Sequence, residues 1–182
     1  MTAAATPAST PAIGGMPTPR QQFLEAYERE HATTMRVLRA YPREKADLKP
    51  HPKCKSAIEL AWIFVQECGL GQAGLHDAFA SGKIGGGSAP PMPDRWEDVL
   101  AALAVAHVDF RKTFESFSDE QLMQPIKFFG APKTLVDYPR LTFAWFLLSD
   151  QIHHRGQMSV YLRMADGKVP SIYGPTLDEP WM

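Results

Sequence analysis

Asp150, His153 and His154 bring a carboxylate and two imidazoles together in the segment SDQIHHRGQ, near the C-terminal end of the chain. Asp150 and His154 are four residues apart, so on a helix both side chains lie on one face, one turn from each other. This spacing allows both to reach one divalent metal ion, and a mixed oxygen and nitrogen donor set suits zinc, nickel, manganese or iron. A hydrogen bond within the helix is the alternative interpretation of the same pair.

Two further histidines are candidates for proton transfer. His153 is adjacent to the Asp150 and His154 pair, and its alternative role is a hydrogen bond to a neighbouring helix or to solvent. His107 lies on an apolar stripe between Leu103 and Phe110. It is therefore either a histidine of the core or a residue that faces the pair across the fold.

Arg155 and Gly156 interrupt the otherwise apolar helix that carries the pair. A glycine in a helix interior costs about 1 kcal/mol relative to alanine, so we expect the backbone of another element to pack closely against Gly156. A buried Arg155 would need a partner, and a carboxylate from another helix or another subunit is the expected one.

Four long helices are the elements that must position these residues. Apolar side chains recur at helical spacing over residues 20–41, 56–80, 94–116 and 139–165, with Ser56 as a predicted cap. A short helical turn starts at Ser118, residues 126–139 are irregular or weakly strand-like, and the Pro- and Gly-containing C-terminal segment should wrap the surface. The pattern predicts an all-α four-helix bundle with two long connections, from the second helix to the third and from the third to the fourth.

Length and composition narrow the class of protein. A chain of 182 residues has room for one domain, and residues 1–19, which carry no charged side chain, predict a flexible N-terminal tail before a folded domain of residues 20–182. Nineteen basic and 20 acidic residues give a net charge of −1, which argues against a nucleic-acid partner. No apolar run could span a bilayer and no secretory signal is evident, so we expect a cytoplasmic protein without membrane contact.

The segment SDQIHHRGQMSVYLRMADGKVPSIYG resembles the C-terminal signature of the DinB-like (DinB/YfiT) superfamily. The match consists of HHRGQ, then Tyr161-Leu162-Arg163, then Gly167 and Pro170, and KSAIELAWIFVQE is similar to the second helix of that family. The resemblance covers roughly residues 20–175. It implies a four-helix bundle with up-down-down-up connectivity that is frequently a homodimer.

The resemblance also implies a metal site of three histidines, one on the second helix and two on the fourth. The last of these is His154, and the position of the first histidine on the fourth helix is occupied by Asp150, which can still bind metal. The position on the second helix falls on or near Ile63, which cannot bind metal. Two of the three positions thus depart from the family pattern.

A different third ligand is then needed. Glu67 lies one turn beyond Ile63 and Glu59 one turn before it, on the same helix face. His107 is a further candidate for this role.

Two functions follow from these observations. One is a metal-dependent enzyme of thiol transferase or hydrolase type, in which Asp150, His154 and a third ligand hold the metal, the metal activates a thiol or a water, and His153 or His107 transfers protons. The other is a non-catalytic dimeric bundle that binds a small ligand or a protein partner, for example in a stress response. The retained Asp150 and His154 pair favours the first, and Ile63 favours the second.

Overall fold

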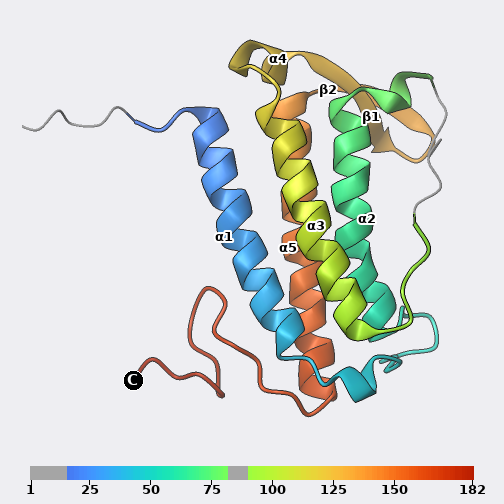
Figure 1. Ribbon diagram of the computed structural model, residues 1–182, viewed down its shortest axis with the longest axis vertical. Helices are drawn as coiled ribbons and strands as arrows, with labels where there is room; N and C mark the ends of the chain where they lie inside the picture. Colours follow the sequence, from blue (N-terminus) through green and yellow to red (C-terminus); the bar gives the residue numbers. More distant parts are fainter. Residues whose placement is uncertain (1–15, 82–89) are drawn as a thin grey trace, which may run out of the picture.

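The computed structural model describes residues 16–81 and 90–182, so most of the predicted tail and part of the Gly-rich loop lie outside the described residues. Four long helices form the body of the protein: α1 (Pro19–Arg39), α2 (Ala57–Leu75), α3 (Trp96–Glu115) and α5 (Arg140–Met164). In Figure 1, α1 and α5 run in one direction while α2 and α3 run in the other. The predicted all-α bundle with up-down-down-up connectivity is confirmed.

Side-chain caps start two of the long helices, one of them at the predicted residue. Ser56 caps α2 and Thr18 caps α1, each through a reciprocal bond with the side chain three residues later. These capping boxes satisfy backbone N–H groups that have no partner inside the helix. The short helix α4 (Asp119–Met123) starts at Ser118 in the same way, as the sequence predicts.

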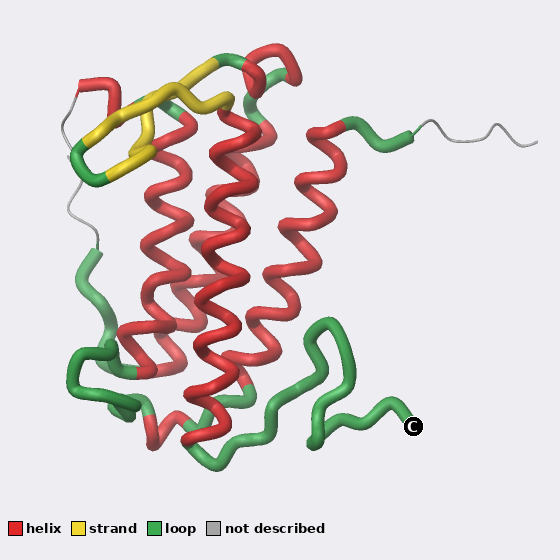
Figure 2. Tube along the Cα trace, turned by 180° about the vertical axis from the view of Figure 1, so that it is seen from behind, coloured by secondary structure: helices red, strands yellow, loops and turns green. Residues whose placement is uncertain are grey.

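The segment expected to be weakly strand-like forms an antiparallel hairpin of β1 (Pro125–Ala131) and β2 (Thr134–Pro139). Figure 2 shows the hairpin across one end of the bundle. The second helix, expected to reach residue 80, ends instead at Leu75, and Asp77 has a positive φ of 57° that breaks it. The Asp77 carboxylate accepts a hydrogen bond from the Lys127 amide at 2.7 Å, so contact with the hairpin determines where α2 ends.

Close packing of α2 against α5 depends on small residues in α2. A Cβ atom added to Gly74 would lie 2.3 Å from the ring of Phe143, and one added to Gly71 would lie 2.9 Å from Leu147. Both Phe143 and Leu147 are buried side chains of α5. The glycines therefore let α2 approach α5 closely, in the half of α2 that follows Glu67.

Arg155 has the carboxylate partner from another helix that its sequence environment led us to expect. Its guanidinium lies 2.8 Å from the Glu30 carboxylate of α1, and both side chains are buried. Tyr173, in the segment after α5, donates a hydrogen bond to Glu30 at 2.7 Å and accepts one from Arg155. This network fixes α5 and the C-terminal segment to α1.

The expectation for Gly156 is wrong. The residue is exposed, and a Cβ atom added to it would have no atom within 4 Å in the described part of the chain. No close backbone contact within residues 16–81 and 90–182 accounts for this glycine.

Candidate metal centre

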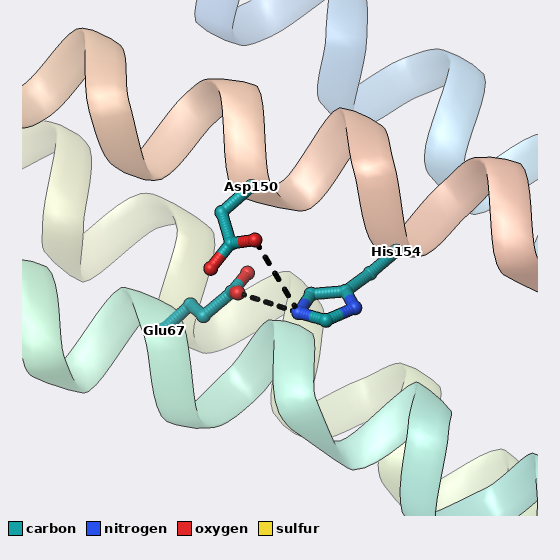
Figure 3. A group of neighbouring side chains, drawn as sticks. All are labelled: Glu67, Asp150 and His154. Carbon is teal, nitrogen blue, oxygen red and sulfur yellow. Dashed lines mark ion pairs between the residues drawn. The ribbon is translucent and has the colours of Figure 1, made fainter. Parts of the chain in front are cut away.

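Glu67 from α2 and Asp150 and His154 from α5 converge between the two helices (Figure 3). One ligand atom from each residue lies within 4.8 Å of the others. His154 Nε2 is 3.2 Å from Glu67 Oε1 and 3.7 Å from Asp150 Oδ1. The i, i+4 pair predicted on the last helix thus faces the carboxylate that lies one turn beyond Ile63.

The group has a buried side and an open side. The side chain of Glu67 is 7% exposed, that of His154 17% and that of Asp150 42%. Burial, together with the adjacent Asp150 and a hydrogen bond to it, raises the pKa of Glu67 to about 9. Two carboxylates therefore meet at a place where one of them is hard to ionise without added positive charge.

Gln157 orients the two neighbouring histidines, a role that the sequence did not reveal. Its Oε1 lies 3.0 Å from His154 Nδ1, and its Nε2 lies 3.0 Å from His153 Nε2. If Nδ1 of His154 donates to the amide oxygen, the lone pair of His154 Nε2 points to the carboxylates. The spacing in the sequence could have indicated this role, because Gln157 lies three residues after His154 and four after His153 and so shares a helix face with both.

These residues fit a divalent metal ion. The donor set is one imidazole and two carboxylates, and Glu67 Oε2 is buried without a hydrogen-bond partner in the described part of the chain. A cation there would satisfy this oxygen and would allow both carboxylates to ionise. The same donor set suits zinc, manganese, iron or nickel.

The other candidate residues lie elsewhere or have other partners. His153 is exposed, next to the group, with its ring centroid 5.4 Å from that of His154. His107 is not brought to the group: its ring stacks on His31 and Tyr27 of α1 at centroid distances of 3.6 and 4.4 Å. Glu59 accepts a hydrogen bond from the Ser56 amide at the start of α2.

His107 belongs to a separate polar cluster between α1 and α3. Its Nε2 is 3.2 Å from Glu28 Oε1, and Arg111 lies 3.1 Å from the same oxygen. Burial lowers the pKa of His107, and burial together with the charge on His107 lowers that of His31 to about 4. The structure therefore makes His107 a buried histidine of this cluster.

A groove of about 470 Å³ runs from His154 between α2 and α5 towards the loop that precedes α2. Its walls are largely apolar and include Leu60, Ile63 and Val160. His154 and Gln157 border both this groove and the metal-binding group. Ile63, at the position where the family pattern places a histidine, is thus a wall residue of the groove.

No helix within residues 16–81 and 90–182 is both long and apolar enough to cross a membrane.

Comparison with known proteins identifies similar chains. The DinB family model matches residues 97–181, which include Asp150 and His154. The uncharacterized protein YrdA of Bacillus subtilis (strain 168) is 26% identical over 162 residues, covering 86% of this chain and 89% of YrdA.

Two solved structures are also similar. A DinB-like protein from Bacillus cereus ATCC 10987 is 25% identical, with a TM-score of 0.69 over 83% of this chain and 95% of the other. A DinB-like protein from Bacillus subtilis, YjoA, is 17% identical and shares the fold with a TM-score of 0.65, over 83% and 97% of the two chains. Together with the family match over residues 97–181 and the bundle connectivity, these likenesses support assignment of the chain to the DinB-like superfamily.

Proposed function

We propose that this protein is a metal-dependent enzyme in which Glu67, Asp150 and His154 hold one divalent ion for a hydrolysis or thiol-transfer reaction. The observation that carries the proposal is the convergence of three ligand atoms within 4.8 Å from two helices. A purely structural ion pair has no need of a second carboxylate, and Glu67 is buried beside Asp150 without a lysine or arginine partner among the described residues.

Each residue of the site has a distinct task. Bound at this place, a divalent ion would lower the pKa of a water or a thiol and so provide a nucleophile at neutral pH. Glu67 binds from the buried side and Asp150 from the side open to solvent, which leaves room for a substrate there. Gln157 holds His154 in position, and the exposed His153 exchanges a proton with the substrate.

The alternative is a non-catalytic bundle that binds a small ligand or a protein partner. It is favoured by the 3.7 Å separation of Asp150 and His154, because an intrahelical pair of this kind needs no metal. The two functions differ in metal content.

Metal content of the untagged protein is the test. Protein purified without chelator should contain close to one equivalent of zinc, manganese, iron or nickel. This metal should be lost in Asp150→Ala and in His154→Ala. His153→Ala is the matched control, since it removes the adjacent imidazole and should keep the metal while losing turnover. Metal-free wild-type protein after incubation with an excess of each ion would rule out the enzyme and favour the binding module.

We also propose that the protein is a homodimer in the cytoplasm. Apolar side chains are exposed on α5 outside the groove, where Phe146 is 47% and Trp145 38% accessible. Such side chains are often covered in an assembly. Light scattering coupled to size exclusion should give twice the monomer mass, and a monomer at micromolar concentration would contradict the proposal.

A further inference from the structure

We infer that the groove between α2 and α5 binds an amphipathic carboxylate, with its anionic end at Lys55 and its apolar chain extending towards His154. The inference deepens the proposed function, because it names the class of substrate that would reach the metal-binding group. The binding itself needs only the groove and can be measured without metal.

The two ends of the groove are chemically different. α2 and α5 are antiparallel, so Ile63 and His154 border one end while Lys55 and Tyr161 border the other. The Tyr161 hydroxyl donates to the Lys55 carbonyl at 2.9 Å, which fixes this second end. Seven residues separate His154 from Tyr161, and at 1.5 Å per residue this gives about 10 Å between the two ends.

The middle of the groove is lined mainly by hydrocarbon. Leu60, Ile63 and Val160 present hydrocarbon, and the Gln157 amide is already engaged with two histidines. A polar chain placed here would lose hydrogen bonds to water without replacing them, whereas an apolar chain would gain from burial. The groove therefore selects an apolar body about 10 Å long.

Lys55 gives the groove its preference for an anion. Within the described residues no carboxylate pairs with its ammonium group, whereas Lys49 of the same loop is paired with Glu59 at 3.6 Å. An unpaired cation at the end of an apolar groove is complementary to a carboxylate with an alkyl or aryl chain. Octanoate has a chain of the required length and serves as the probe.

Cys54 provides a readout that is independent of metal. It is exposed and borders the groove beside Lys55, whereas Cys68 is buried and burial raises its pKa to about 11. Iodoacetamide, in the presence of a chelator, should therefore alkylate Cys54 alone, and the intact mass should report one addition. Octanoate should slow this reaction in a saturable manner.

Two variants test the charged end and the apolar wall of the groove separately. Lys55→Gln should raise the half-protecting octanoate concentration about threefold to fivefold, the loss expected for one partly exposed ion pair. Lys53→Gln is the matched control: it also removes a lysine next to Cys54, but its side chain does not line the groove. For each variant, the alkylation rate at each octanoate concentration is divided by the rate of the same variant without octanoate. A change in the reactivity of the Cys54 thiol therefore does not alter the half-protecting concentration.

A charge in the apolar wall is the second test. Val160→Asp should abolish protection, while Val105→Asp, an equally exposed valine on α3, should leave it intact.

The outcomes separate this inference from the proposed function. No protection by octanoate, or equal protection by octanol, would overturn the anion-binding groove whatever the metal content proves to be. Protection that is weakened in Lys55→Gln and lost in Val160→Asp, but unchanged in the two control variants, would support it, even in a preparation that binds no metal.

Discussion

Replacing Glu67 by methionine should have opposite effects on stability in the absence and in the presence of a divalent metal. Methionine has a similar length and no polar atoms, so it removes the buried carboxyl while it keeps much of the packing. In chelated protein we expect the variant to be more stable than the wild type. With metal, only the wild type should be stabilised.

The expected size follows from the surroundings of Glu67. Its pKa is raised to about 9 from an ordinary 4.5, so at pH 7 the folded protein keeps a proton that the unfolded chain has released. The 2.5 pH units between 4.5 and 7 correspond to about 3 kcal/mol of lost stability. The contact with His154 offsets part of this cost, which leaves about 2 kcal/mol, or about 4–8 °C in melting temperature for a chain of this size.

The sign of the pH dependence is a further check. A raised pKa in the folded state means that the stability contribution is complete below pH 4.5 and is lost progressively as the pH rises towards 9. The advantage of Glu67→Met over the wild type should therefore grow from pH 5 to pH 8. Thermal melts in chelator at several pH values measure it.

Metal should reverse the order of stability. An ion at one hundred times its dissociation constant stabilises the wild type by about 2.7 kcal/mol, and the variant, which lacks one ligand, should gain little. Gln66→Met, an exposed neighbour on α2, is the control and should change neither melt. If Glu67→Met melted well below the wild type in chelator, Glu67 would be a structural residue and the reasoning would be refuted.

Three other changes test the fold around the site. Gly156→Ala should raise stability by up to about 1 kcal/mol in chemical denaturation, because its added methyl meets no atom of the described chain within 4 Å; a loss would reveal a partner at this surface. Arg155→Met should cost about 3 kcal/mol in the same assay, since it removes the buried cation of Glu30 and leaves only the exposed Arg29, 3.5 Å away, and no loss would contradict the network. The pKa of His31 is lowered to about 4, so between pH 6.5 and 4 the unfolded chain binds a proton that the folded protein does not. The protein should therefore lose about 1–2 kcal/mol of stability over this range, after allowance for solvent screening. His31→Gln should flatten that part of the pH profile, and an unchanged profile would show that His107 and His31 do not share this environment.

The long helices could be predicted because each has a sustained apolar period, and the caps at Ser56 and Ser118 are visible in the sequence. The end of α2 could not be predicted in the same way. It depends on Asp77, whose carboxylate bonds to a hairpin fifty residues later in the chain. Local sequence carries no information about that contact, so the predicted helix ran five residues too far.

The same distinction between local spacing and long-range packing applies to the candidate site. The spacing of Asp150 and His154 is a property of one helix, so it could be read from the sequence. Choosing among Glu67, Glu59 and His107 as a third member required the alignment of α2 with α5, which depends on packing. Only the structure shows that Glu67 is the residue that meets the pair.

The geometry of α5 explains how the candidate site is kept in place. Successive residues on a helix are about 100° apart, so Arg155 points to a different side of α5 from Asp150 and His154. On that side Arg155 is tied to Glu30 and Tyr173, while on the other Gly74 of α2 meets α5 closely. Rotation of α5 would break a buried ion pair on one side and a tight contact on the other. The face that carries Asp150 and His154 is therefore held towards Glu67 by contacts that involve none of the three, which is the kind of support that a preorganised metal site requires.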